Sequence, residues 1–407
     1  MIEPLSILTF FGITIALGYI GSLIFERTSI PDIVWLLLFG LLVGPVFNLM
    51  DRTTFITASS LLGAIALLII LFDAGLHMDI YQIISKISRG VLLVFLGIFL
   101  SIGGIALVSI FVFNFGFIES LILGSIISGT SSAIVISIVD PLKIKDGIKT
   151  VLKLESIITD PIVIVLTMAL IQIATATEDT PTIPILNNLA SMYSVAVVIG
   201  LLAGIIWLFV LDKIKRREFD YMLTLAVVFL LYVFAESIGG SGAITALMFG
   251  LVLSNSYAFS KMLKFKKRYR VNKTLKRFHG EITFFIRSFF FVYLGLIATF
   301  SLIYLYYGLI FLVVLIVMRL AAVQISTYKM TITKVEKNIM RSMMGRGLAA
   351  AVLAQMPLIY GIKNAEVFSN VAFIIILLTV LFNIIFVKIF YKPEFEVKEK
   401  KSKKRKV

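Results

Sequence analysis

Long apolar stretches alternate with short polar ones along nearly the whole chain. Windows of about 20 residues that are almost free of charge recur thirteen times. A run of about 18 or more uncharged residues is long enough to cross a bilayer as a helix. The predicted spans are 6–25, 30–49, 57–76, 90–113, 118–139, 151–175, 189–211, 219–238, 241–257, 282–301, 304–325, 340–361 and 366–391. The pattern predicts an all-α polytopic membrane protein with about 13 transmembrane helices.

The composition excludes a soluble protein. Of the 407 residues, 59% are hydrophobic and 15% are charged, whereas soluble domains are about half apolar and a quarter charged. The net charge of +15 fits the lysines and arginines that orient a membrane protein, so we expect the lipid bilayer and not nucleic acid as a partner. Because cysteine is absent and histidine occurs twice, disulfides and Cys/His zinc sites are excluded.

Positive charge is distributed unevenly between the two sides of the predicted membrane. The loops and adjoining helix ends on one side, with the C-terminal segment, hold 33 of the 38 Lys and Arg residues. The loops on the other side hold only Arg52 and Lys363. Since positive loops stay in the cytoplasm, we expect a multi-pass protein of the cell membrane with its N-terminus outside and its C-terminus cytoplasmic.

The helix count also predicts an internal symmetry. Six helices on each side of one extra helix place the second half upside down relative to the first, which is the inverted-repeat plan of many secondary transporters. The fifth helix carries Gly129-Thr130-Ser131-Ser132 at its middle, and the twelfth carries Gly345-Arg346-Gly347. These weak helix formers are either breaks that form a binding site or small residues that let helices pack closely.

Seven of the ionisable residues in the predicted spans stand out as candidates. A charge at the centre of a membrane helix costs at least about 2.5 kcal/mol, so each is a functional candidate, with structural pairing as the alternative. They are Asp73, Glu155, Asp160, Glu236, Arg287, Arg319 and Arg346.

Two of these acids share the sixth helix but cannot share one small site. At about 100° per residue, Glu155 and Asp160 point about 140° apart. Ser156 shares the face of Asp160, and Thr159 shares the face of Glu155. We therefore expect Asp160 to face the substrate and Glu155 to turn towards a counter-charge, for which Arg319 is the candidate.

Asp160 is followed by Pro161, which frees the carbonyl of Ile157 one turn back. A carboxylate, hydroxyl groups and freed carbonyls together make a site for a hard cation. The alternative is that Asp160 is itself part of a salt bridge.

The residues also resemble a known family. The stretch ESIITDP (155–161), the TSS of the fifth helix, and the runs AESIGGSGAITALMFGLVL, FFIRSFFFVYLGL and GRGLAAAVLA are similar, in this order, to the monovalent cation/proton antiporter superfamily, particularly its sodium/proton exchanger branch. The similarity runs from about residue 30 to residue 385. It implies the antiporter fold, with helices 5 and 12 broken.

The resemblance implies a role for each matching residue. Asp160 matches the transport aspartate, Glu155 the acid that pairs with an arginine, and Arg319 and Arg346 the core arginines. The implied ion-binding residues are Asp160, Ser156, Thr130, Ser131, Thr159 and Asp73, of which Asp160, Ser156 and Thr130 would hold Na⁺. Asp73 matches an acid near the cytoplasmic funnel. The resemblance implies no cofactor, only the transported ions Na⁺ and H⁺. It also implies a homodimer, because relatives are homodimers.

The same plan divides the chain into moving and static parts. The interface parts are 1–89 and 219–302, the core transport parts are 90–175 and 303–391, the linking helix lies in 176–218, and the basic cytoplasmic tail is 392–407. We expect the tail, which reads KEKKSKKRK at 398–406, to contact anionic lipid or to lead to a regulatory domain. The basic stretch Lys261 to Arg277 is expected to lie on anionic lipid.

Two departures from the family pattern bear on the ion. The exchanger branch usually has Asn before the transport aspartate, where this chain has Thr159, and often Asp after the threonine of the break, where this chain has Ser131. The run SSAIVIS is similar instead to the branch that includes potassium-efflux antiporters. The expected function is exchange of Na⁺ (or Li⁺) for H⁺ by alternating access, with both ions competing for Asp160 in an electroneutral 1:1 cycle; K⁺/H⁺ antiport is the alternative.

Two other classes of function fit the sequence less well. A cation channel would need a ring of carbonyls or charges along a continuous pore, and no filter-like sequence is present. An intramembrane protease would need two facing aspartates, which the offset between Glu155 and Asp160 argues against. The sequence therefore favours a carrier over a channel or an enzyme.

Overall fold

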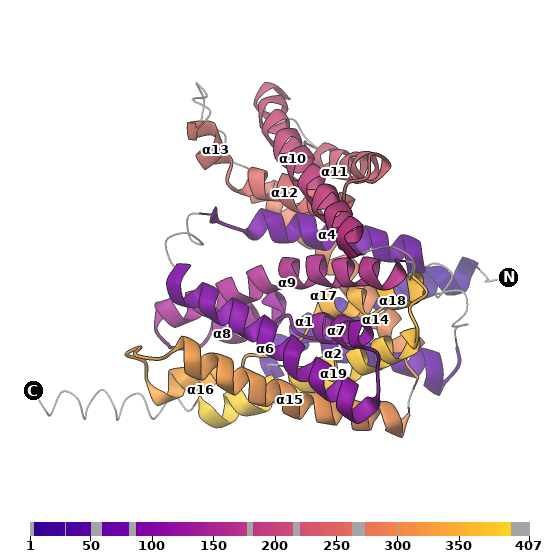
Figure 1. The fold of residues 1–407 in the computed structure, drawn as a ribbon, viewed down its shortest axis with the longest axis vertical. Helices are drawn as coiled ribbons and strands as arrows, with labels where there is room; N and C mark the ends of the chain where they lie inside the picture. Colours follow the sequence, from indigo (N-terminus) through magenta and orange to yellow (C-terminus); the bar gives the residue numbers. More distant parts are fainter. Residues whose placement is uncertain are drawn as a thin grey trace, which may run out of the picture.

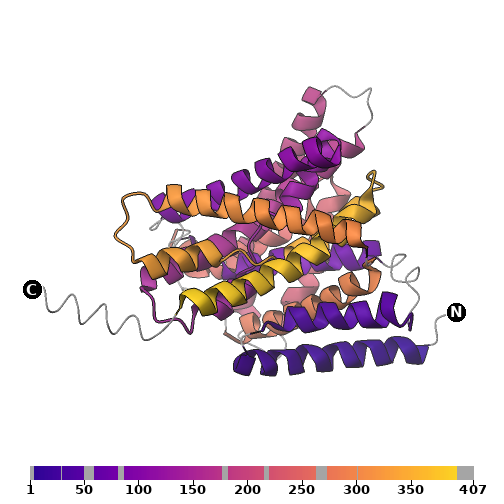
Figure 2. The ribbon, with the colours of Figure 1, turned by 90° about the horizontal axis from the view of Figure 1, so that it is seen from below.

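The computed structural model describes residues 4–28, 30–49, 59–80, 87–176, 182–214, 220–262, 273–299 and 301–391. Every secondary-structure element in these ranges is a helix. The helices form one bundle in which most axes run in roughly the same direction (Figure 1). Figure 2 shows α1 beginning at one end of this bundle and α19 finishing at the other, as an odd number of crossings predicts.

The helices of the first half cover predicted spans one to six. They are α1 (Pro4–Thr28), α2 (Asp32–Leu41) with its π-helical continuation η1 (Leu42–Val46), α4 (Ser59–His77), α6 (Ile87–Phe113), α7 (Phe117–Ile126), α8 (Ser132–Val139) and α9 (Asp146–Thr175). The helix that links the halves is α10 (Thr182–Ile214).

The second half follows in the same order. Its helices are α11 (Asp220–Ser237), α12 (Gly242–Ser254), α13 (Ser256–Met262), α14 (Lys273–Ile297), α15 (Leu302–Ser326), α16 (Lys334–Ser342), α17 (Leu348–Leu353), α18 (Met356–Ile359) and α19 (Ala365–Phe390). Each of the thirteen predicted segments thus contains helix. Six described helices are long and apolar enough to cross a membrane alone, or seven if the bent pair α12 and α13 is one span; the count of thirteen spans stays a prediction.

Both predicted helix breaks are present. The first separates α7 from α8 and the second separates α16 from α17. The breaks touch each other, because the Ser131 backbone amide donates a hydrogen bond of 2.8 Å to the Gly345 carbonyl. Gly347 packs so closely on the Ser131 side chain that a Cβ atom there would overlap it. The small residues therefore serve to bring two unwound backbones into contact.

Contacts between the halves follow the inverted-repeat plan. Helix α2 packs on α14, and α4 packs on α12. In the inverted-repeat plan α2 is equivalent to α12 and α4 is equivalent to α14, so the two contacts are equivalent to each other. Both pairs cross at glycines: Gly40 and Gly295 in the first, Gly75 and Gly250 in the second. A Cβ atom at any of the four would overlap a backbone carbonyl of the facing helix, so the backbones are in direct contact, as in other small-residue crossings.

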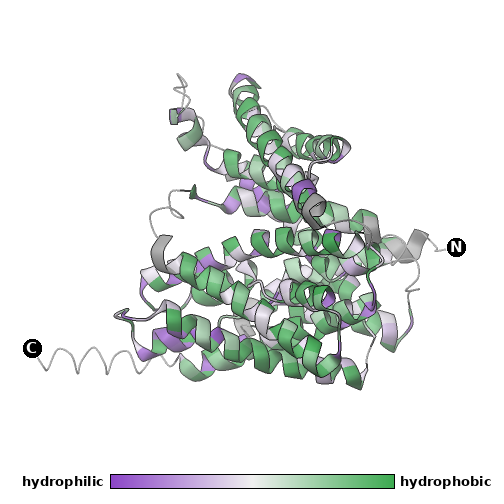
Figure 3. Ribbon diagram, in the orientation of Figure 1, coloured by the Kyte–Doolittle hydropathy of each residue, from purple (hydrophilic) through white to green (hydrophobic). Residues whose placement is uncertain are grey.

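The outside of the bundle is apolar, as Figure 3 shows. Large side chains that face outwards include Phe111 on α6 and Leu302 on α15, each 77% exposed. Contact with lipid tails accounts for this exposure, which would be unusual on a soluble monomer. The protein is thus a multi-pass membrane protein. The basic tail 392–407 and most of the basic segment after α13 lie outside the described residues, and the division into interface and core parts stays a prediction.

Candidate functional site

Helix α9 carries the two acids of the candidate site and passes beside both breaks. It runs without interruption through Pro161, and it presents Asp160 and Glu155 to different cavities. The cavity on the Asp160 side has a volume of about 280 Å³, and the one on the Glu155 side has a volume of about 10 Å³. This separation follows from the angle of about 140° between the two positions.

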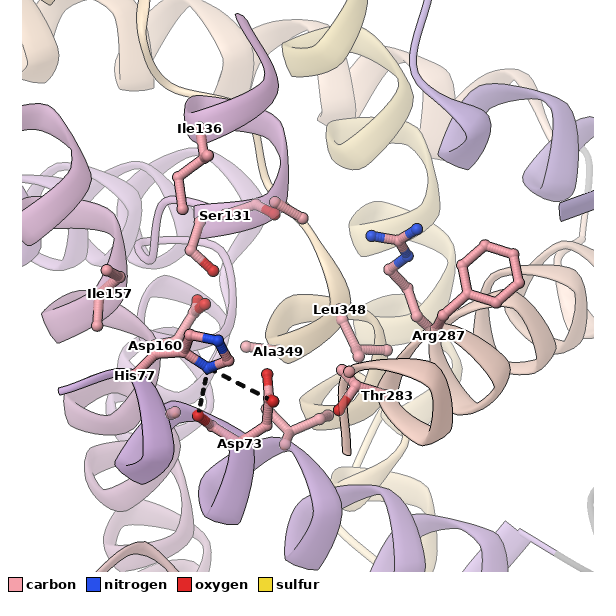
Figure 4. A pocket seen from close by; sticks show the side chains of 16 residues that line it. Asp73, His77, Ser131, Ile136, Ile157, Asp160, Thr283, Arg287, Leu348 and Ala349 are labelled. Atoms are coloured by element: carbon pink, nitrogen blue, oxygen red, sulfur yellow. Dashed lines mark hydrogen bonds and ion pairs between the residues drawn. The ribbon is translucent and has the colours of Figure 1, made fainter. Parts of the chain in front are cut away.

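The larger cavity lies between helices of the predicted interface parts and helices of the predicted core transport parts (Figure 4). Helices α4 and α14 form one wall, and α8, α9 and α17 form the other. The polar residues that line it are Asp73, His77, Ser131, Ser132, Asp160, Thr283 and Arg287. It combines two aspartates with hydroxyl groups, and this makes it the candidate site for a cation.

Asp160 is placed at the point where the first break ends. The backbone amide of Ser132, the first residue of α8, lies within hydrogen-bonding reach of its carboxylate. The positive end of a helix dipole stabilises an anionic group there. Gly129 lies close by, because a Cβ atom there would be in van der Waals contact with Asp160 Oδ1 at 3.7 Å and would crowd the Val163 side chain at 2.9 Å. The break therefore positions the carboxylate as well as interrupting the helix.

Asp73 and His77 approach the cavity from one turn of α4. His77 Nδ1 lies 2.9 Å from the Asp73 carbonyl oxygen and 3.5 Å from Asp73 Oδ1. The His77 side chain is about half exposed, whereas that of Asp73 is 22% exposed. This pair thus lies between the Asp160 end of the cavity and its accessible edge, and Figure 4 shows both residues on the Asp160 side.

On the opposite face of α9, Glu155 forms a buried ion pair with Arg319 of α15. Both guanidinium NH₂ groups reach the carboxylate, one of them at 3.0 Å from Oε2. Arg319 Nε also donates to the Met340 carbonyl at 2.9 Å. Glu155 is 2% exposed and Arg319 is 5% exposed, so the two opposite charges compensate each other in a place with little access to water.

Arg346 lies in the second break and holds backbone groups of both breaks. Its Nε donates to the carbonyl of Ile127 at 2.6 Å, and its Nη1 donates to that of Met344 at 2.8 Å. Carbonyls at a helix end have no partner within their own helix, so the guanidinium satisfies groups that the breaks expose. Its charge also lies within electrostatic range of Glu155 and Asp160.

The structure divides the ion-binding residues implied by the sequence between two places. Ser131 and Asp73 line the larger cavity with Asp160. Thr130 and Thr159 line the small cavity beside Glu155, and their hydroxyl oxygens are 3.1 Å apart. Ser156 is fully buried, and its hydroxyl donates to the Lys153 carbonyl at 3.0 Å. The hydroxyls of Thr130, Thr159 and Ser156 are thus engaged by protein groups in this structure.

Comparison with known proteins adds the family. A family model described as "Sodium/hydrogen exchanger, transmembrane" matches residues 12–392. The chain belongs to the sodium/hydrogen exchanger family. Members of this family are transporters, so the protein is a transporter of the exchanger type and its fold is the antiporter fold.

Individual members differ in the ion that their names give. The chain is 27% identical over 312 residues to a probable Na⁺/H⁺ antiporter 2 of Methanocaldococcus jannaschii, covering 71% of this chain and 68% of that protein. It is 25% identical over 384 residues to the K⁺/H⁺ antiporter NhaP of Alkalimonas amylolytica, covering 91% of this chain and 64% of that protein. This exchanger thus spans about two thirds of the length of both relatives.

The fold has a close match among solved structures. The sodium proton antiporter MjNhaP1 of Methanocaldococcus jannaschii, at pH 8, superimposes with a TM-score of 0.79 at 23% identity, over 94% of this chain and 97% of that one. At this identity the match establishes the shared fold, and the antiporter fold expected from the sequence is confirmed.

Two charged residues of this exchanger's cavity region escaped the sequence analysis as a pair. Arg287 Nη2 lies 2.6 Å from Asp32 Oδ2. Asp32 is not among the seven candidates named from the sequence, although it is an acid inside the predicted span 30–49. That position was the available signal, because a charged side chain inside a membrane span is costly and needs a partner.

The donor set suits a singly charged cation. Within the described ranges, no group of three or more histidine, aspartate or glutamate side chains is placed to hold a metal ion. The larger cavity instead offers single carboxylates from different helices with hydroxyl and backbone oxygens nearby. Sites for Ca²⁺ usually gather several carboxylates, so the cavity fits a monovalent hard cation better.

Proposed function

We propose that this protein exchanges Na⁺ (or Li⁺) for H⁺ across the membrane by making the two ions compete for the Asp160 carboxylate. The observation that carries the proposal is the position of Asp160 at the meeting point of a broken helix and the 280 Å³ cavity. A carboxylate there accepts either a proton or a cation. Release of one ion is therefore required before the other binds, and this requirement is what couples the two fluxes.

The cavity's walls support alternating access. Helices α4 and α14 belong to the predicted interface parts, and α8, α9 and α17 belong to the predicted core parts. Movement of the core against the interface would close this cavity and open another on the far side of Asp160. Such rocking around a site at broken helices is the general scheme for inverted-repeat transporters.

Further properties belong to the same proposal. The distribution of positive charge supports a cell-membrane protein with an external N-terminus, in which the His77 end of the cavity opens to the cytoplasm. We propose that the protein is a homodimer and that it uses no cofactor beyond the transported ions. We also propose that the basic tail either contacts lipid or leads to a regulatory domain. The exchanger is a carrier and neither a channel nor an enzyme.

A second candidate substrate is K⁺. It is favoured by the names of several relatives, which are K⁺/H⁺ antiporters in Alkalimonas and Shewanella, and by Ser131 at the position where the sodium branch often has an aspartate. One carboxylate fewer lowers the field strength around the cation, which favours the larger, less strongly hydrated ion.

Cation-driven proton movement in proteoliposomes tests the function. Liposomes that contain the purified protein and a trapped pH dye are acidified inside, and Na⁺, Li⁺, K⁺ or Ca²⁺ is added outside. We expect Na⁺ and Li⁺ to alkalinise the lumen and Ca²⁺ to have no effect. A response to K⁺ alone would replace Na⁺ by K⁺ as substrate, and the absence of any response would overturn the antiporter proposal.

The cycle should be electroneutral. If Glu155 stays paired with Arg319, only Asp160 changes its occupant, so one Na⁺ replaces one H⁺. An electrogenic cycle that moves one charge across 100 mV would gain or lose about 2.3 kcal/mol, and its rate would respond clearly to voltage. We expect the Na⁺-driven pH change to be the same at several potentials clamped with K⁺ and valinomycin.

Cation selectivity has to be measured before the clamp is used, because transport of K⁺ by the protein would disturb it. A strong voltage dependence would contradict the 1:1 cycle. It would mean that a second group, either Asp73 or an unpaired Glu155, also changes its charge during transport.

A further inference from the structure

Arg287 is an unexpected neighbour for a cation. Its side chain lines the same cavity as Asp160 and Asp73, and Figure 4 shows its guanidinium across the cavity from Asp160. An uncompensated positive charge on the wall of this cavity would repel a bound cation, because the effective dielectric constant of such a site is below that of water. Asp73 lies in the same cavity and within electrostatic range of Arg287, but a cation is accepted more readily if a group outside the cavity also offsets this charge.

Asp32 supplies the missing negative charge. Its Oδ2 lies 2.6 Å from Arg287 Nη2, and the two side chains are 11% and 21% exposed. Asp32 is in the first turn of α2, where the helix dipole stabilises a carboxylate. Its other oxygen accepts a hydrogen bond of 3.0 Å from the Ile33 amide. The carboxylate is therefore fixed in direction by a partner on each of its two oxygens.

The position of Arg287 depends on this pair. Its Nε is buried and has no hydrogen-bond partner in the described part of the chain, so Asp32 provides its charged anchor. The Phe284 ring, 5.5 Å from the guanidinium carbon, supports it from the side. On the Asp32 side, Gly21 of α1 packs against the aspartate, because a Cβ atom at Gly21 would come within 3.1 Å of the Asp32 Cα and Cβ atoms.

The pair stands where two cavities meet. A second cavity of about 140 Å³ is lined by Asp32, Ser22 and Ser137. Ala133 and Arg287 line both this cavity and the larger one. Asp32 therefore holds the guanidinium at the junction of the two cavities.

We propose that Asp32 sets the cation affinity of the Asp160 site by neutralising and holding Arg287. This inference rests on the proposed exchange function. Asp32 is a positioning residue, since it acts through Arg287 and does not line the cavity that contains Asp160. The ligand it affects is the monovalent cation, which is repelled when Arg287 is released and tolerated when Arg287 is paired.

The experiment measures how the rate of proteoliposome exchange depends on Na⁺ concentration at fixed pH. Asp32→Asn removes the negative charge and leaves Arg287 unpaired, whereas the double variant Asp32→Asn/Arg287→Gln removes both charges. Because Asp32→Asn leaves the charge of Arg287 uncompensated, we expect this variant to raise the apparent KM for Na⁺ about tenfold. The rate at saturating Na⁺ should stay within about twofold, and the double variant should return KM to within about twofold of the wild type.

A surface pair on the same helix provides the matched control. Arg277 and Glu281 of α14 form an ion pair at 3.2 Å, with side chains 84% and 66% exposed. Glu281→Gln also leaves an arginine unpaired, but in solvent, where it contributes little. It should leave KM and the maximal rate unchanged.

The possible outcomes separate the two proposals. An active wild type with an unchanged KM in Asp32→Asn would overturn this inference alone. A double variant whose KM stays tenfold higher than that of the wild type would also overturn it. The same holds for an Asp32→Asn variant that loses maximal rate and thermal stability without a change in KM, because such a loss is expected of a purely structural pair. A wild type without cation-driven proton flux would overturn the exchange function, and this inference with it.

Discussion

Replacing Asp160 by asparagine should abolish exchange while leaving the protein folded. The amide of asparagine can neither bind a proton nor carry the negative charge that a cation needs, so we expect the Na⁺-driven pH change to fall by at least about a hundredfold. The two side chains have nearly the same shape, and the Ser132 amide that approaches Asp160 can still meet the amide oxygen. The thermal unfolding temperature should therefore remain close to that of the wild type.

The measurement is the proteoliposome assay together with thermal unfolding of the detergent-solubilised protein. Asp146→Asn is the matched control, because Asp146 is an exposed aspartate in the first turn of the same helix, and this variant should exchange normally. A variant of Asp160 that exchanged at the wild-type rate would show that the ions are carried by another group.

Glu155→Ala should have the opposite profile, with a large loss of stability. Removing one partner of a buried ion pair leaves the other charge uncompensated, which costs about 3–5 kcal/mol. Glu155 and Arg319 are both buried, so Glu155→Ala should unfold well below the temperature at which Asp160→Asn unfolds. Arg319→Met combined with Glu155→Ala should recover part of the loss, because an apolar replacement of both charges leaves none unpaired.

Thermal unfolding of the four proteins checks this prediction. The exposed pair again provides the control, and Glu281→Ala should change the unfolding temperature little. If Glu155→Ala and Asp160→Asn unfolded at the same temperature, Glu155 would have to be moved from the structural pair to the ion site.

Helical periodicity was enough to separate the two acids of α9. Once a segment is known to be helical, the angle between Glu155 and Asp160 is fixed by their spacing, and the structure places them at different cavities. The breaks were visible as clusters of Gly, Ser and Thr because these residues are weak helix formers. The sequence also showed the family, through motifs whose order matched.

The partners of side chains within the site were harder to predict. Thr130 lies in an unwound segment, where a helical wheel gives no direction, and only the fold reveals that it faces Thr159. Ser156 shares a helix face with Asp160, but its hydroxyl bonds to a carbonyl one turn back, as serines in helices often do.

The pairing of Asp32 with Arg287 joins residues 255 positions apart. No local pattern encodes such a contact. It depends on how α2 and α14 pack, and that packing is decided by glycines on both helices.

Those glycines also bear on the origin of the chain. When the two halves are matched helix by helix, Gly40 corresponds to Gly250 and Gly75 corresponds to Gly295. The crossing of α2 with α14 and the crossing of α4 with α12 are therefore the same contact, made once in each direction. Two separate copies of a half-length chain, inserted in opposite orientations, would form the same two crossings between molecules. The glycines therefore mark a contact that once could have held an antiparallel dimer together, and that gene duplication and fusion through the linking helix α10 would have preserved within a single polypeptide.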